Sequence, residues 1–186
     1  MLVILTQAQI IEKIGSSAAE TFAGLYEQYL PKVYRYVSYR ITDTHTAEDL
    51  TSAVFEKALT KFNSYKADKA AFSTWIFTIA RNTLTDHFRA NQSHKTVLLE
   101  DPAAAAAESN NRPEEESEKE EELQALRTCV ARLSKSEQEI ISLKFGAEMT
   151  NRQIASMLSL SESNIGIIVY RAVRKLRDSF REKQDA

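Results

Sequence analysis

Glycine and proline are scarce in this chain of 186 residues, which has four of the first and three of the second. Strand-rich proteins need many turns and use both residues in them, so their scarcity favours an all-α fold with long helices. No glycine-rich phosphate loop is present. The single cysteine, Cys129, excludes an internal disulfide and fits a reducing compartment. Its apolar neighbours predict a buried thiol.

Long hydrophobic runs are also missing. The longest apolar run is about six residues, far below the length of a membrane-spanning helix. The apolar stretch at residues 1–5 follows no basic segment and is too short for a signal peptide. We therefore expect a cytoplasmic protein with no membrane insertion.

The net charge of -2 conceals three blocks of different charge. Residues 1–96 carry 11 basic and 9 acidic groups, and residues 123–186 carry 11 basic and 7 acidic groups. Between them, residues 97–122 carry 2 basic and 10 acidic groups. Two mildly basic blocks therefore flank a strongly acidic one, which suits a nucleic-acid-binding protein better than the mean charge suggests.

The acidic block has the composition of a linker. Prolines, a run of alanines and acidic residues follow one another without helical periodicity, which predicts a flexible tether. We predict an N-terminal helical domain over residues 1–96, the linker over 97–121, and a C-terminal domain of four helices over 122–186. The linker serves either as a spacer or as a mimic of nucleic acid.

The strongest motif spans residues 150–177. Thr150, with a glutamine three residues later, and Ser161 are capping signals for two helices, and Ser159 lies where the chain must turn between them. The small Ala155 lies where two crossing helices would touch. Apolar residues fall at Ile154, Leu158, Leu160, Ile165 and Ile168. This is the layout of a DNA-binding helix-turn-helix, whose second helix enters the major groove. The alternative is an ordinary helical hairpin.

The second of these helices carries side chains suited to DNA. Asn164 can pair with adenine, Ile167 can contact a thymine methyl group, and the basic residues near the helix end suit phosphates. The residues expected to point outward are Ser163, Asn164, Gly166, Ile167, Tyr170, Arg171, Arg174, Lys175 and Arg177.

A helix predicted over residues 72–90 has two contrasting faces. Its apolar face consists of Phe72, Trp75, Ile76, Ile79, Ala80, Thr83, Leu84 and Phe88. Its other face consists of Thr78, Arg81, Asn82, Thr85 and Arg89. Arginine, asparagine and threonine can donate to bases and phosphates, whereas an ordinary solvated face would be richer in glutamate and lysine.

Lysines and aromatic residues alternate just before and within that helix. The lysines are Lys57, Lys61, Lys66 and Lys69, and the aromatic residues are Phe62, Tyr65, Phe72, Trp75 and Phe77. Cations hold phosphates and flat rings stack on bases, so this pattern suits single-stranded nucleic acid. The alternative is that most of these rings form the core, and Trp75 could serve either purpose.

Other helix starts follow from local signals. Ser17, Thr46 and Ser136 each precede an acidic residue by three positions, as in a capping box. Pro31 suits the first turn of a new helix. The helix after Ser136 is expected to place Phe145 on its inner face.

Catalysis is not expected, and neither is a cofactor or a metal. His45, His87 and His94 lack the spacing of metal ligands, and Cys129 has no evident base. Asp86 and His87 are adjacent, so on a helix their side chains diverge by about 100°.

Three runs together resemble the sigma factors of bacterial RNA polymerase, in particular the short extracytoplasmic-function (ECF) group of the sigma-70 family. These runs are AEDLTSAVFEKAL at 47–59, FSTWIFTIARNTLTDHFR at 72–89 and the helix-turn-helix at 150–177. The resemblance implies binding to core RNA polymerase, recognition of a bipartite promoter, and control by an anti-sigma factor.

The resemblance also assigns residues to three surfaces. Contacts to the melted minus-ten element would come from Lys61, Lys66, Trp75, Thr78, Arg81, Asn82, Thr85 and Arg89. Contacts to the minus-thirty-five element would come from Thr150, Gln153, Ser161, Ser163, Asn164, Ile167, Tyr170, Arg171, Arg174 and Lys175. The polymerase would be bound by Glu48, Asp49, Ser52, Phe55 and Glu56.

The chain departs from the family pattern at five positions, one of which is Ser159, where the turn usually has glycine. Ser52 and Ala53 stand where the family commonly has glutamine and an acidic residue, and Gly166 and Ile168 stand where it usually has basic residues. Two other functions fit the sequence. One is a helix-turn-helix regulator with a helical sensor or dimerisation domain, and the other is an adaptor held by a regulatory protein through residues 20–60.

Overall fold

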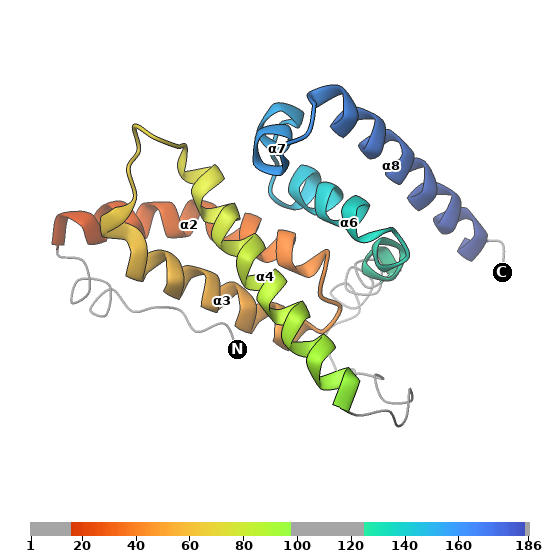
Figure 1. The fold of residues 1–186 in the computed structure, drawn as a ribbon, viewed down its shortest axis with the longest axis horizontal. Coiled ribbons are helices and arrows are strands. Elements are labelled where there is room, and N and C mark those ends of the chain that lie inside the picture. The colour runs from red at the N-terminus through yellow and green to blue at the C-terminus, as the bar shows by residue number, and fades with distance from the viewer. Residues whose placement is uncertain (1–15, 98–124, 185–186) are drawn as a thin grey trace.

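The computed structural model describes residues 16–97 and 125–184, and all the regular elements in these ranges are helical (Figure 1). This confirms the predicted all-α fold. The first fifteen residues and nearly all of the predicted linker at 97–121 lie outside the described residues.

The N-terminal part contains three long helices. They are α2 (Ser16–Ser38), α3 (Thr44–Lys61) and α4 (Phe72–Val97), with a short 3₁₀ helix, η1 (Phe62–Ser64), directly after α3. Figure 1 shows α4 crossing α2 and α3, and each pair of these helices is in contact. The three helices thus form a small bundle.

Two predicted helix starts in this bundle are wrong. Pro31 does not begin a helix but lies inside α2. A proline removes one hydrogen bond from a helix, but buried side chains on both sides of it, such as Phe22 and Val33, fix the helix against its neighbours. Helix α3 begins before Thr46, because the Asp43 carboxylate accepts a hydrogen bond from the Thr46 backbone N–H at 2.7 Å. Hydrogen bonding by the Thr46 side chain, and then by its backbone N–H, lowers the pKa of Asp43.

The C-terminal part consists of shorter helices and one long one. Residues 125–131 are helical, and α6 (Lys135–Ile141) continues into a π-helix, η2 (Ser142–Gly146). The helix-turn-helix follows as α7 (Asn151–Leu158) and α8 (Glu162–Gln184). The capping box predicted at Ser136 is wrong, because Ser134 occupies that role with Glu137 as its partner.

The capping signals of the helix-turn-helix are confirmed. The Thr150 hydroxyl accepts a hydrogen bond from the Gln153 N–H, while the Gln153 side chain accepts one from the Thr150 N–H. The Ser161 hydroxyl accepts from the Asn164 N–H at 3.2 Å. Ser159 ends α7 in the left-handed conformation with φ 56°. Local sequence signals therefore fix both ends of the turn.

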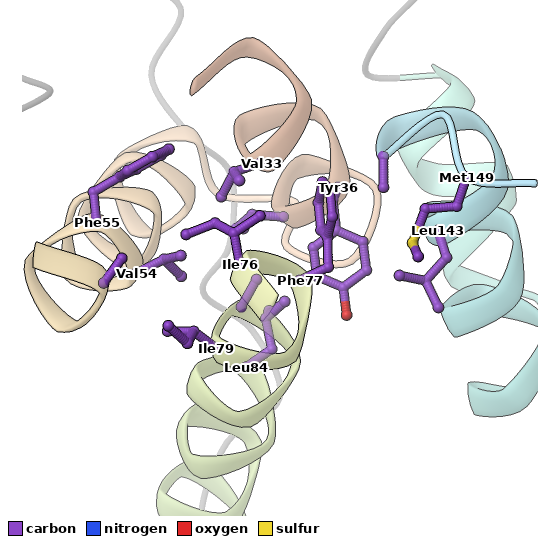
Figure 2. Packing of buried hydrophobic residues seen from close by; sticks show 14 of the residues in the cluster. Val33, Tyr36, Val54, Phe55, Ile76, Phe77, Ile79, Leu84, Leu143 and Met149 are labelled. Carbon is purple, nitrogen blue, oxygen red and sulfur yellow. The ribbon is translucent and has the colours of Figure 1, made fainter. Parts of the chain in front are cut away.

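One hydrophobic cluster runs through both parts of the chain. From α2, α3 and α4 it includes Tyr36, Phe55 and Phe77, and from the C-terminal part it includes Leu143 and Met149. Figure 2 shows Tyr36 and Phe77 facing Leu143 and Met149 across the contact. The two parts therefore bury side chains against each other.

Two sequence predictions about burial have opposite outcomes. The predicted burial of the Cys129 thiol is confirmed. Phe145, expected on an inner face, is 46% exposed. The π-helix inserts one extra residue per turn relative to an α-helix, which rotates side chains in this segment away from the helical register that the sequence suggested.

Within residues 16–97 and 125–184, we find no helix with the length and apolarity that a membrane crossing demands.

The left-handed Ser159 leads to a test of local strain. Ser159→Gly removes the Cβ that clashes in this conformation, so we expect an increase in stability of about 1 kcal/mol and a melting temperature a few degrees higher. Ser156→Gly, three residues earlier and inside α7, is the matched control. It should instead lower stability, by about 0.5–1 kcal/mol. Thermal unfolding followed by circular dichroism distinguishes the two, and a destabilised Ser159→Gly variant would contradict this account.

Candidate nucleic-acid-binding surfaces

Four aromatic rings gather at the start of α4 and in the segment before it. The Tyr65 ring lies 5.5 Å from the Phe72 ring and 5.0 Å from the Trp75 ring, and Phe62 stacks on Tyr65 at 6.2 Å. The Tyr65 hydroxyl donates to the Ala70 carbonyl at 3.0 Å, which closes the loop. We call Phe62, Tyr65, Phe72 and Trp75 the aromatic cluster.

The aromatic cluster is only partly covered. Phe72 is buried, whereas Phe62, Tyr65 and Trp75 are half-buried, so part of each ring system faces solvent. Lys61 and Lys66 beside it are exposed. Phe72 therefore belongs to the core, whereas the other three rings are only partly covered, and their use in binding single-stranded nucleic acid stays a prediction. Phe77, however, is fully buried and lies outside this surface.

The polar face of α4 is exposed as predicted. Thr78, Arg81, Asn82 and Arg89 are exposed, and Thr85 is half-buried. The Thr78 and Thr85 hydroxyls donate to carbonyl groups one turn earlier, so they can only accept from a ligand. Asn82 keeps its amide in solvent one residue after Arg81 and seven residues after Trp75 of the aromatic cluster.

Arg81 has a partner from the C-terminal part. Its Nε atom lies 3.5 Å from Glu139 Oε1 on α6. The sequence could not indicate this pairing, because the two residues are far apart in the chain and neither belongs to a recognisable common motif.

The predicted polymerase surface on α3 is largely accessible, with one correction. Asp49 and Glu56 are exposed, and Glu48 and Ser52 are half-buried. Phe55 is only 1% exposed and packs edge-on against Tyr26, with ring centroids 4.7 Å apart. It belongs to the core of the bundle. A phenylalanine inside an amphipathic helix is more often part of the core than of a binding surface, and the position of Phe55 four residues before Leu59 was the available signal.

The second helix of the helix-turn-helix presents a mixed face. Ser163, Asn164, Ile167, Tyr170, Arg171 and Arg174 are all exposed. Tyr170 is 69% exposed and Ile167 50%, which is unusual for residues of this size. Val173 is also exposed and lies three residues after Tyr170, as Tyr170 lies three residues after Ile167. The apolar part of this face is thus larger than the sequence analysis indicated.

Some residues assigned to DNA contact have structural partners. The side chains of Thr150 and Gln153 bind each other in the capping box, with the Thr150 hydroxyl donating to Gln153 Oε1 at 2.9 Å. The Gln153 amide nitrogen still has its hydrogens to donate. The Ser161 hydroxyl is occupied as an acceptor by its own helix. Thr150, Gln153 and Ser161 therefore cap the helices of the helix-turn-helix, and any contact with DNA would be in addition to this role.

Lys175 connects α8 to α6 through an ion pair with Glu137. Its Nζ donates to Glu137 Oε1 at 2.7 Å, and the other oxygen of that carboxylate accepts from the Ser134 N–H at 2.9 Å and from the Ser134 hydroxyl at 2.8 Å. The hydrogen bond from Lys175 is the main cause that lowers the pKa of Glu137. This ion pair joins α8 to the start of α6.

Two family models match the chain on either side of the linker. The sigma-70 region 2 model matches residues 25–94, and the sigma-70 region 4 model matches residues 123–176. The chain belongs to the sigma-70 family. The first match contains the aromatic cluster and α4, and the second contains the helix-turn-helix. A sensor or dimerisation domain in the N-terminal part, the alternative raised above, has no support from these matches.

Curated relatives agree with this assignment. The chain is 33% identical over 168 residues to the ECF RNA polymerase sigma factor BldN of Streptomyces coelicolor. The aligned region covers 90% of this chain and 63% of BldN. The chain is 26% identical to the ECF RNA polymerase sigma factor SigM of Bacillus subtilis, over 84% of this chain and 93% of SigM. The chain thus spans somewhat less than two thirds of BldN and nearly all of SigM.

Two solved structures share the fold of this sigma factor. CnrH, solved in complex with the cytosolic domain of CnrY, has a TM-score of 0.64 at 20% identity and covers 95% of both chains. The sigma factor RpoE of Bartonella quintana, solved with the anti-sigma factor NepR, has a TM-score of 0.66 at 22% identity. That match covers 87% of this chain and 98% of RpoE.

The ion pair between Glu137 and Lys175 predicts a dependence of stability on pH. Because the pKa of Glu137 is lowered on folding, its charge stabilises the sigma factor above its ordinary pKa of 4.5. This contribution is lost as the pH falls through the lowered pKa of the folded state. Glu137→Gln should therefore reduce stability at neutral pH by up to about 1 kcal/mol and have no effect in strong acid.

Thermal melts of the natural protein and of Glu137→Gln, at neutral pH and at about pH 3, test this direction of the pH dependence. Glu27→Gln, which removes an exposed carboxylate of α2, is the control and should leave both melts unchanged. A difference between Glu137→Gln and the natural protein that persists undiminished in acid would show that the charge is not responsible.

Proposed function

We propose that this sigma factor binds core RNA polymerase and directs it to promoters with two separated elements. Sigma-70 proteins are transcription initiation factors without catalytic activity of their own, and this role needs no cofactor. The observation that carries the proposal is the presence of two different nucleic-acid-suited surfaces on one chain, each inside a matched sigma-70 region.

The surface on the N-terminal part is assigned to melted minus-ten DNA. The half-buried rings of the aromatic cluster give flat partners for unstacked bases, and the exposed Lys61 and Lys66 attract phosphates. Asn82 and Thr85 on α4 supply polar groups for base edges. A duplex offers no exposed base faces, so such a surface is useful only after strand separation.

The helix-turn-helix is assigned to the minus-thirty-five duplex. Its α8 presents Asn164 for a base edge and Ile167 for a thymine methyl group in the major groove. Arg171 and Arg174 suit phosphates and determine position more than sequence. With Gly166 in place of a basic residue, binding should depend on salt less steeply than in a more cationic recognition helix.

The remaining partners follow from the same function. The α3 surface with Glu48, Asp49, Ser52 and Glu56 is assigned to the polymerase. CnrH and RpoE were each solved with a bound protein, and NepR is an anti-sigma factor. Control of this chain by an anti-sigma factor, and action in the cytoplasm, are therefore part of the proposal.

In vitro transcription with core polymerase and a library of promoter fragments tests this function. Specific initiation that requires the added protein supports it. A protein that neither binds core polymerase nor changes its start sites would refute it, and a palindromic duplex site bound without polymerase would indicate an independent regulator instead.

Asn82→Ala provides a sharper test of the minus-ten assignment. Asn82 is exposed, so its truncation should not affect folding or polymerase binding. We expect open-complex formation to fall by about tenfold, because a lost hydrogen bond to a base costs about 1–3 kcal/mol. Permanganate footprinting of melted thymines measures this effect.

The matched control is Asn91→Ala, which truncates another exposed asparagine of α4, nine residues after Asn82 and therefore on the opposite side of the helix. Normal open complexes with Asn82→Ala, or equal loss of polymerase binding and melting, would remove Asn82 from the assigned site.

A further inference from the structure

Three exposed apolar residues follow one another on the outer side of α8. Ile167 and Tyr170 are at least half exposed and Val173 is 42% exposed, and they recur at a spacing of three residues, which keeps them on one side of a helix. The opposite side of α8 packs on the domain through Ile165 and Ala172, which are completely buried. We call Ile167, Tyr170 and Val173 the apolar strip, and it is not part of the core.

Gly166 lies beside the apolar strip, and the fold does not require a glycine there. A Cβ atom at this position would meet only the Asn151 amide nitrogen, at an ordinary contact distance of 3.7 Å, and the residue is not in the left-handed conformation. Glycine inside a helix is destabilising relative to alanine. Neither packing nor backbone geometry therefore explains Gly166, which leaves a role at the surface.

That role concerns the ring of Tyr170, four residues later. Long side chains of a helix lean toward its N-terminus and cover the turn before their own Cα atom, so Tyr170 leans over position 166. A long basic side chain at this position, as in the usual family pattern, would lie against the ring. Ile168, the other position where the family usually has a basic residue, packs against the core instead. Gly166 thus keeps the apolar strip uncovered.

The surroundings of the apolar strip favour DNA as the molecule that covers it. Arg171 and Arg174 directly follow Tyr170 and Val173 in the chain, and both are exposed. An apolar strip flanked by cations matches a DNA groove, whose floor consists of bases and whose edges are phosphates. The strip also lies within residues 123–176, which match sigma-70 region 4, and on the helix already assigned to the minus-thirty-five duplex.

One group on the floor of the major groove is apolar, namely the C5-methyl group of thymine. The other base edges present donors and acceptors, which an apolar side chain would leave without partners. The six residues from Ile167 to Val173 extend about 9 Å along the helix axis. Base pairs are stacked about 3.4 Å apart, so the apolar strip is about as long as three base pairs.

We propose that the apolar strip reads a run of about three A·T pairs through their thymine methyl groups, and that these contacts select the minus-thirty-five element of this sigma factor. The inference rests on the proposed function, since it concerns the duplex assigned to α8. It extends the single contact of Ile167 by making Tyr170 and Val173 specificity-determining residues. Gly166 contributes by leaving room for the bases to approach them.

Deoxyuridine in place of thymine tests the methyl contacts, because uracil pairs with adenine as thymine does and lacks only the methyl group. Duplexes are first selected from a random-sequence library with the full chain at low salt, without polymerase, and we expect enrichment of A·T runs. Replacing the thymines of that run by deoxyuridine should weaken binding about fourfold for one methyl group and about sixtyfold for three. Fluorescence anisotropy measures this ratio of affinities.

The combined variant Ile167→Ala and Tyr170→Ala connects the effect to the apolar strip. Both side chains are exposed, so their truncation should not affect folding. The variant should bind the thymine duplex more weakly and lose most of the difference between thymine and deoxyuridine. Phe145→Ala is the matched control, because it truncates an exposed aromatic ring outside α8 and should leave the ratio unchanged.

Gly166→Arg gives a test with the opposite sign. The added charge should tighten binding to every duplex at low salt and make it depend more steeply on salt. The same side chain covers the Tyr170 ring, so the ratio between thymine and deoxyuridine should fall. A tighter but less methyl-dependent variant cannot be explained by damage to the fold.

Three outcomes would overturn the inference: no enrichment of A·T runs, an affinity that deoxyuridine leaves unchanged, or a ratio that persists without Ile167 and Tyr170. Enriched A·T runs that tolerate deoxyuridine would indicate readout of DNA shape instead. All these measurements omit polymerase, whereas the proposed function is measured with it. If deoxyuridine weakens binding but core polymerase ignores the protein, the methyl contacts stand and the proposed function fails.

Discussion

Tyr36 is the residue on which the arrangement of the whole chain depends. Its ring is completely buried and meets Phe77 edge-on, with ring centroids 5.5 Å apart. Its hydroxyl donates to Glu139, and its backbone leaves no room for a side chain at position 146. Burial and the neighbouring Glu139 carboxylate both raise the pKa of the phenol. A buried hydroxyl needs a partner, and here that partner comes from the other part of the chain.

This arrangement connects folding with the proposed activity. The N-terminal bundle positions the aromatic cluster and the polar face of α4, and the C-terminal part positions α8. Each surface is built within its own domain. The interface between the domains instead places Glu139 against Arg40 and Arg81, and Glu148 against Lys32 and Arg35.

The helix-turn-helix illustrates how much local sequence can specify. Thr150, Ser161 and Ser159 determine the two starts and the turn through contacts that span at most three or four residues. Such contacts can be recognised because each residue type has a distinct hydrogen-bonding role at a fixed offset. The Pro31 and Phe145 predictions failed because the burial of α2 and the π-helix of η2 override the local pattern. The Ser136 prediction failed for a local reason, because Ser134 forms the capping box two residues earlier.

By itself, the sequence determined the all-α fold, the helix-turn-helix, the polar stripe of α4 and the family. These features are periodic or local, so neighbouring residues reveal them. Only the tertiary structure decided that Phe55 is core, that Lys175 binds Glu137, and that Glu139 and Glu148 face Lys32, Arg35, Arg40 and Arg81. Those contacts join segments separated by up to 113 residues. Periodicity within one helix does not indicate which distant helix it will contact.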